Sequence, residues 1–267
     1  MSIDPGAKAP GAGERLASLD QFRGYTVLGM LLVNFVGGFA LVKPTILAHH
    51  HVYCSYADTI MPQFLFAVGF AARLVFLKRL AAGGARASYV RAIRRSIGLF
   101  LLAAVWYELD RKFGKWDDLV AAWTTEGPWR FILSCFEREP FQTLAHIAVA
   151  SLWTLPVIAA SWRVRLLFLA GSVALHAGLS HWQYFDPLVR PVLSSIGLVS
   201  PEPSSWNYLE WVTRRPGIDG GPLGFLTWSI PLLVGTFAHD LVRRGWGPLR
   251  LALLGAAIAF AAYAASC

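Results

Sequence analysis

The chain has 267 residues, of which 55% are hydrophobic and only 15% are charged, and it carries a formal net charge of +8. Soluble domains have about 25% charged residues, so this composition argues against a soluble enzyme and predicts a membrane protein. The positive charge does not indicate a nucleic-acid-binding protein, because the sequence has no basic stripe with interleaved aromatic side chains.

Seven apolar segments predict an all-α fold. We expect a polytopic transmembrane helical bundle over residues 18–267, after a polar tail of residues 1–17. A helix of about 20 residues crosses the hydrocarbon core of a bilayer. The expected membrane helices cover residues 24–42, 59–77, 96–107, 141–160, 166–179, 223–242 and 251–267.

The loops between these segments differ in length and charge. Two loops are long and cover residues 108–140 and 181–222. The first contains "KWDDLVAAW" and "WRFILSCF", which suit helices lying in the membrane interface. The second is too rich in proline for a long helix. The short loops near residues 78–95, 163–165 and 243–250 are rich in Lys and Arg. The positive-inside rule places these loops and the N-terminus in the cytoplasm and both long loops outside. This pattern predicts a multi-pass protein of the cell (inner) membrane.

Polar residues interrupt the first expected helix, "SLDQFRGYTVLGMLLVNF". Asp20 and Arg23 are three residues apart and therefore share a helix face. They fit an interfacial ion pair, with Ser18 as the helix cap, and they also fit a ligand-binding role. Asn34 lies further along the same helix, where a membrane asparagine serves either helix association or function.

The segment "HHHVYCSYAD" precedes the second expected helix and faces outward in this topology. Three interpretations of its histidines remain open: a solvated loop, a metal site, or a catalytic histidine oriented by Asp58 or Asn34. Consecutive side chains converge poorly on one ion, and no second cluster of His and Cys supports a metal, so we expect none. Asp58 also suits the N-terminus of a helix, where it would act as a cap.

Two later segments carry candidate binding residues. In "PFQTLAHIA", Gln142 and His146 are four residues apart and share a helix face. They would make polar contacts either with neighbouring helices or with a substrate. Asp219 lies in the Gly-rich segment "GIDGGPLG" before the sixth expected helix. Such a segment binds anions in some proteins and is an ordinary turn in others.

The order of these motifs resembles the heparan-alpha-glucosaminide N-acetyltransferase family of transmembrane acyltransferases. "SLDQFRGYTVLGMLLVN", a histidine-containing loop and "ADTIMPQFLFAVGF" carry the resemblance, and "PFQTLAHIA" and "DGGPLGFLTWSIPLLVG" extend it more loosely. Members transfer an acetyl group from cytoplasmic acetyl-CoA to an acceptor across the membrane, such as the amine of a glucosamine. They usually have more membrane helices than seven, so this chain is expected to lack C-terminal helices of the family.

The resemblance implies a set of site residues. Asn34 stands at the family's catalytic asparagine, and Tyr53 stands where members have Trp, which selects His50 as the catalytic histidine, with His49 second and His51 third. The resemblance further implies an acyl-CoA donor and a glycan or other outward-facing amine or hydroxyl acceptor. We therefore expect Asp20 and Arg23 to assist cofactor binding, Gln142 and Asp219 to assist substrate binding, and Asp58 to assist catalysis.

Several alternatives stay open at this level. Transfer through an acetylated histidine and direct transfer to the acceptor are both compatible with these residues. A non-enzymatic transporter or scaffold would instead use Asp58, Asn34 and Gln142 as a polar pathway through the membrane. A homo-oligomer is compatible with either function.

Overall fold

The structure is a computed structural model that describes residues 17–37, 39, 44–48, 54–112, 116–128, 143–181, 190–195 and 223–266. These residues form helices and contain no strand, which confirms the all-α fold class. In chain order the elements are α1 (Ala17–Gly37), η1 (Thr45–Leu47), α2 (Tyr56–Lys112), α3 (Trp116–Glu126), α5 (Thr143–Thr154), η2 (Leu155–Val157), α6 (Trp162–His181), α7 (Arg190–Ser195), α9 (Gly224–Arg243) and α10 (Pro248–Ser266).

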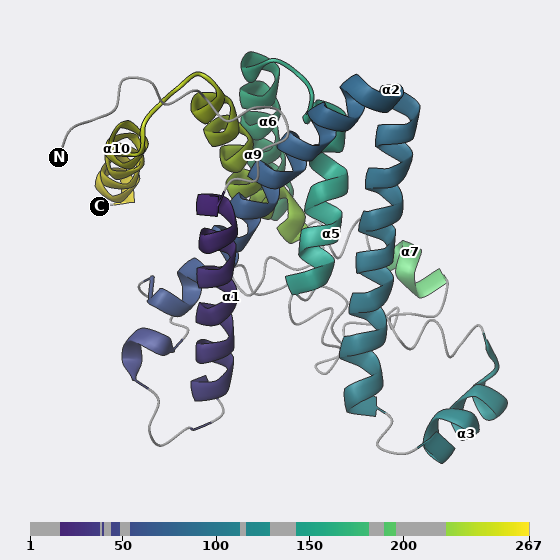
Figure 1. Cartoon of the computed structure of the whole chain (residues 1–267). Coiled ribbons are helices and arrows are strands. Elements are labelled where there is room, and N and C mark those ends of the chain that lie inside the picture. Colours follow the sequence, from purple (N-terminus) through teal and green to yellow (C-terminus); the bar gives the residue numbers. More distant parts are fainter. Residues whose placement is uncertain are drawn as a thin grey trace.

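Helix α2 consists of two arms that meet at a sharp kink (Figure 1). Gly84 has φ 76° and ψ 175° at the kink, a backbone conformation that glycine adopts readily because it has no Cβ. The sequence predicted separate helices over residues 59–77 and 96–107 with a basic loop between them. That prediction is wrong about the loop, because the intervening Ala, Leu and Arg residues favour helix and continue it up to the kink.

The expectation of seven membrane helices is not confirmed. Among the described residues, two stretches are long and apolar enough to cross a membrane, Tyr56–Val105 within α2 and Gly224–Arg243, which is α9. The apolar parts of α5–η2 and α10 are shorter. In α1, the polar side chains of Asp20, Arg23 and Asn34 interrupt the apolar sequence.

The other segment boundaries agree with the sequence to differing degrees. Helix α9 matches the expected segment 223–242 closely, and α10 matches 251–267, whereas α6 begins earlier than 166–179. Helix α5 is shorter than 141–160 because the chain tightens into the 3₁₀ turn η2, which contains Pro156. "KWDDLVAAW" lies within and just before α3, while its placement in the membrane interface stays a prediction.

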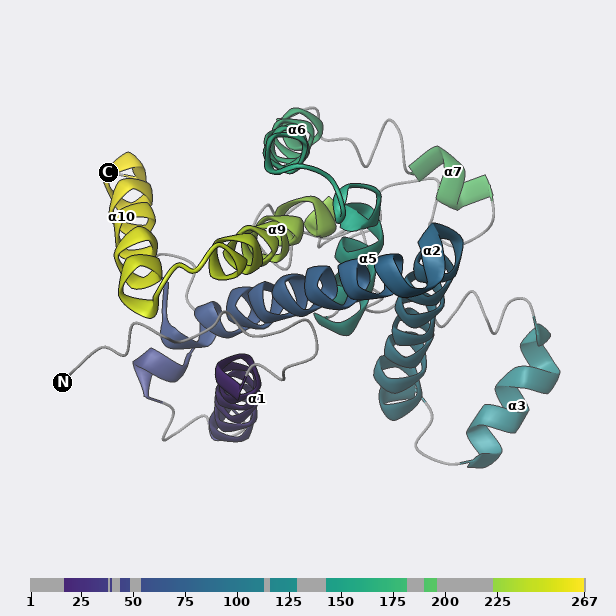
Figure 2. The same cartoon turned by 45° about the horizontal axis from the view of Figure 1, so that its top comes forward.

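The centre of the fold is the contact between α9 and the first arm of α2. The two helices cross obliquely in Figure 1 and lie next to each other in Figure 2. Leu65 and Leu232 are buried there with Ile147 and Ala150 of α5. The contact is close because a Cβ on Gly69 would overlap the carbonyl oxygen of Leu232, and one on Gly235 would overlap that of Phe66. Small residues of this kind allow membrane helices to approach each other closely.

Candidate functional site

The histidine-containing loop joins α2 at a capping box formed by Ser55 and Asp58. The backbone N–H of Ser55 donates to Asp58 Oδ2 at 2.9 Å, and the hydroxyl of Ser55 also lies 2.9 Å from this oxygen. The same hydroxyl lies 2.6 Å from the carbonyl oxygen of Ala48. The carboxylate of Asp58 thus satisfies the free backbone N–H of Ser55 at the helix N-terminus. The arrangement also holds together Ala48 and Ser55, the residues on either side of the segment that carries the histidines.

Asp58 therefore caps α2, which is one of the two roles expected from the sequence. Its catalytic role stays a prediction, because His49, His50 and His51 lie outside the described residues. Asn34 is exposed on α1, while its neighbour Val33 packs against Ala57 and Ile60 in the first turns of α2.

The other predicted site residues are distributed as follows. On α1, Asp20 is half-buried and Arg23 is exposed. Gln142 and Asp219 lie outside the described residues. His146, which shares the predicted polar face with Gln142, is buried on α5 with its ring centroid 6.4 Å from that of Trp228.

A pocket of about 220 Å³ lies between the two arms of α2 and α5. Arg23, Arg79 and Arg95 line it. Ser88, Ser96 and Ser151 also line the pocket, and its remaining wall is mainly apolar. We call this cavity the basic pocket. The kink at Gly84 creates it, because the chain reverses there and brings Arg79 and Arg95 from different arms to the same cavity.

From the sequence, Arg79 and Arg95 indicated only the topology, as members of a basic loop. The Gly83–Gly84 pair within a helix-forming run was the one local signal for a reversal. Three guanidinium groups supply planar donors of the kind that bind phosphate groups. Among the described residues, no group of three or more His, Cys, Asp or Glu side chains is placed to hold a metal ion.

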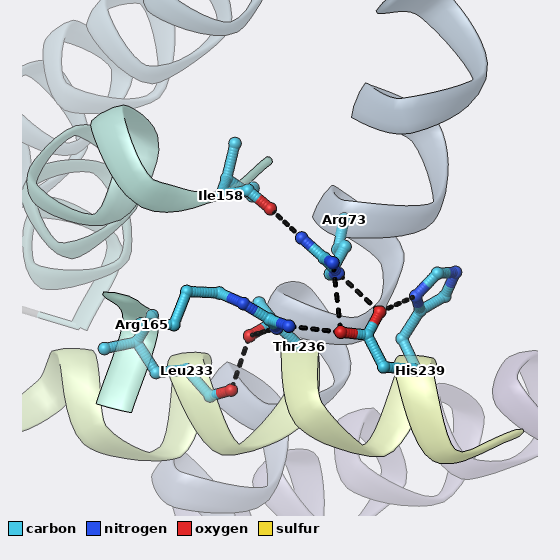
Figure 3. Close-up of polar contacts among 7 residues, drawn as sticks. Arg73, Ile158, Arg165, Leu233, Thr236 and His239 are labelled. Atoms are coloured by element: carbon cyan, nitrogen blue, oxygen red, sulfur yellow. Dashed lines mark hydrogen bonds and ion pairs between the residues drawn. The ribbon is translucent and has the colours of Figure 1, made fainter. Parts of the chain in front are cut away.

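A second polar cluster lies on the buried side of α9 and is centred on Asp240 (Figure 3). Arg73 Nε and Nη2 donate to the two oxygens of this carboxylate at 2.6 and 3.0 Å. Arg165, which is completely buried, pairs with the same carboxylate and donates to Thr236 Oγ1 at 2.6 Å. His239 Nδ1 lies 3.2 Å from Asp240 Oδ1.

This Asp240 cluster joins several elements of the fold. Its charged residues come from α2, α6 and α9, and Arg73 also donates to the carbonyl oxygen of Ile158, just after η2. One carboxylate serves two arginines, so both cations depend on it for a charged partner within the cluster. No local sequence pattern predicts that Arg73 and Arg165 pair with Asp240, because the three residues are far apart in the chain.

A protein-family comparison provides the family assignment. The family model described as "Heparan-alpha-glucosaminide N-acetyltransferase, catalytic" matches residues 15–212. The chain belongs to this family. The matched region includes the capping box and the three arginines of the basic pocket, whereas α9 and α10 follow it in the sequence. Membership indicates an acetyltransferase-type enzyme associated with a membrane. No curated protein and no solved structure matches the chain.

Proposed function

We propose that this protein is a transmembrane acetyltransferase that moves an acetyl group from cytoplasmic acetyl-CoA to an amine or hydroxyl on the opposite side. The match to the catalytic family model over most of the chain is the observation that carries the proposal. The distribution of Lys and Arg supports the orientation, with the N-terminus in the cytoplasm and the histidine-containing loop outside. In a bacterial-type cell the protein would occupy the inner membrane.

The basic pocket is the proposed site for the phosphate groups of acetyl-CoA. Its arginines would bind these phosphates by charge-assisted hydrogen bonds, and the serines would add hydroxyl donors. Arg23 lines this pocket, which supports its predicted role in cofactor binding. Asp20 lies one turn from Arg23 on α1 and would help to orient it.

Replacing Arg79 or Arg95 with glutamine is expected to weaken coenzyme A binding by about tenfold or more, because each change removes a charged hydrogen-bond donor. Isothermal titration of the protein in lipid nanodiscs with coenzyme A measures the dissociation constant. Arg91→Gln is the matched control, since Arg91 is an exposed α2 arginine outside the pocket lining. Equal affinity in Arg95→Gln, Arg79→Gln and wild type would show that the phosphates bind elsewhere.

The acceptor reaction is assigned to the loop between α1 and α2. Neutral His50 would take a proton from the acceptor amine as the amine attacks the acetyl carbonyl, or it would accept the acetyl group first. Coenzyme A would leave as the thiolate and take up the proton. Asn34 would orient the imidazole or donate a hydrogen bond to the carbonyl oxygen. Gln142 and Asp219 remain predicted substrate-binding residues, and the capping box at Asp58 would fix the loop's junction with α2.

His50→Ala is expected to abolish acetyl transfer from acetyl-CoA while leaving coenzyme A binding within about twofold of wild type, since general acid–base catalysis alone supplies about 10²–10⁴-fold in rate. Radiolabelled acetyl transfer to glucosamine measures the first quantity, and titration with coenzyme A measures the second. His49→Ala is the neighbouring control. If His50→Ala retained full activity and His49→Ala lost it, the catalytic assignment would pass to His49.

A further inference from the structure

One wall of the basic pocket is formed where α5 ends. Leu155 of η2 and Ile158, the C-cap of η2, line the pocket there. Both are buried together with Phe76 of the first arm of α2, which lines the pocket as well. We call this side of the pocket the η2 wall. Arg73 lies three residues before Phe76 in the same helix but is not part of the lining.

Arg73 joins the η2 wall to the Asp240 cluster through one side chain (Figure 3). Its Nε and Nη2 donate to the carboxylate of Asp240 at 2.6 and 3.0 Å, and its Nη1 donates to the carbonyl oxygen of Ile158. The side chain of Arg73 is only 9% exposed, so water competes little for these bonds. The three bonds hold the guanidinium between the carboxylate on α9 and the backbone of the η2 wall.

The bond to Ile158 is placed where the backbone itself supplies little restraint. The N–H of Ile158 donates to the carbonyl oxygen of Leu155 at 3.3 Å within the short 3₁₀ turn. Carbonyl groups at the end of a helix lack the usual N–H donor from the following turn and need another partner. Arg73 supplies a charged donor to the carbonyl of Ile158, and charge-assisted bonds are roughly twice as strong as neutral ones.

Arg165 pairs with the same carboxylate but contacts a different part of the fold. It donates to Thr236 Oγ1 at 2.6 Å, and its guanidinium carbon lies 4.7 Å from the centroid of the Phe237 ring on α9. Neither Arg165 nor these two α9 residues line the basic pocket. The two arginines are therefore both partners of Asp240, but only Arg73 also bonds to a residue of the pocket wall.

We propose that Arg73 is a positioning residue for coenzyme A binding: oriented by Asp240, its guanidinium fixes the backbone of Ile158 and with it the η2 wall of the basic pocket. This inference rests on the proposed function, which assigns the phosphates of acetyl-CoA to that pocket. Arg73 acts through Ile158 and not as a ligand contact, since it lies outside the lining. Asp240 follows the matched family region, which ends at residue 212, so α9 contributes to coenzyme A binding by orienting Arg73.

The test makes the same conservative change at both arginines in the full chain in lipid nanodiscs. Arg73→Lys keeps a positive charge beside Asp240, but one ammonium group replaces the planar guanidinium and cannot hold the carboxylate and the Ile158 carbonyl in the same geometry. Arg165→Lys is the matched control within the same cluster. We expect Arg73→Lys to raise the dissociation constant of coenzyme A about fivefold or more and Arg165→Lys to leave it within about twofold, as measured by isothermal titration.

Thermal unfolding and kinetics separate positioning from a role in stability alone. Both variants loosen the Asp240 cluster, so each is expected to lower the unfolding temperature by roughly 2–8 °C. In Arg73→Lys, the KM for acetyl-CoA should rise while kcat stays unchanged. Equal changes of coenzyme A affinity in the two variants, or no change in Arg73→Lys, would overturn the inference.

A second variant replaces Arg73→Lys if that variant does not fold. Arg73→Met, Arg165→Met and Asp240→Leu together leave no buried ions in the cluster and also remove the donor to Ile158. This triple variant is expected to bind coenzyme A about fivefold or more weakly than wild type. Wild-type affinity in the triple variant would contradict a positioning role for Arg73.

A measurement without ligand separates this inference from the proposed function. Leu155 is 7% exposed and lines the pocket, so Leu155→Cys, in a chain whose three native cysteines are replaced by serine, reports movement of the η2 wall. We expect Arg73→Lys to speed its reaction with a methanethiosulfonate reagent about fivefold or more, and Arg165→Lys to change the rate by less than about twofold.

The two readouts together distinguish the possible failures. Faster labelling in Arg73→Lys, combined with no coenzyme A binding by the wild type, would support the fixing of the η2 wall and contradict the proposed function. Coenzyme A binding by the wild type, combined with unchanged labelling and unchanged affinity in Arg73→Lys, would support the proposed function and overturn the inference.

Discussion

Asp240→Ala is expected to destabilise the folded protein by about 3–5 kcal/mol, because it leaves Arg73 and Arg165 buried without their carboxylate. That cost is a large fraction of the total stability of a typical domain, which is about 5–15 kcal/mol. Thermal unfolding in detergent and the monodisperse fraction on size-exclusion chromatography measure the effect. Asp118→Ala on the exposed surface of α3 is the control and should change stability by less than about 0.5 kcal/mol.

A second variant tests whether the cost comes from the unpaired charges. Replacing the whole set, with Arg73→Met, Arg165→Met and Asp240→Leu together, removes the buried ions and keeps similar side-chain volume. Buried ion clusters replaced in this way by apolar residues are often equally stable or more stable. We therefore expect the triple variant to be more stable than Asp240→Ala alone. If the triple variant were instead less stable than Asp240→Ala, the ion pairs and hydrogen bonds of the Asp240 cluster would themselves add to the stability of the fold.

Gly69→Ala and Gly235→Ala are each expected to destabilise the packing of α2 against α9 by about 1–3 kcal/mol or more. In both cases the new methyl group would overlap a backbone carbonyl oxygen on the facing helix, and the backbone cannot rotate away as a side chain would. The temperature of unfolding in detergent measures the loss.

Gly98→Ala and Gly171→Ala are matched controls for this effect. Both lie within helices, and a Cβ at either position would meet no atom within 4 Å beyond the neighbouring backbone of its own helix. Because alanine favours helix by roughly 1 kcal/mol over glycine, these controls should be neutral or stabilising. A similar loss of stability in all four variants would contradict the close contact between α2 and α9.

The residues of the candidate site differ in how far the sequence predicted their roles. Sequence alone suggested that Asp58 would cap a helix, since a carboxylate at this position follows a general rule, and the capping box confirms that role. His50 was selected by resemblance, and its catalytic role remains a prediction.

The amino-acid sequence by itself determined the helical fold class and the family. Apolar segments long enough to form helices are visible in the local composition. The family motifs from "SLDQFRG" to "ADTIMPQFLFAVGF" are short continuous segments, so the sequence shows them without a structure. The arrangement of charges was decided only by the tertiary structure. Arg79 and Arg95 meet because the chain reverses at Gly84, and Arg73 meets Asp240 because α2 and α9 pack at two glycines. Such long-range contacts depend on the packing of whole helices, which local sequence patterns do not specify.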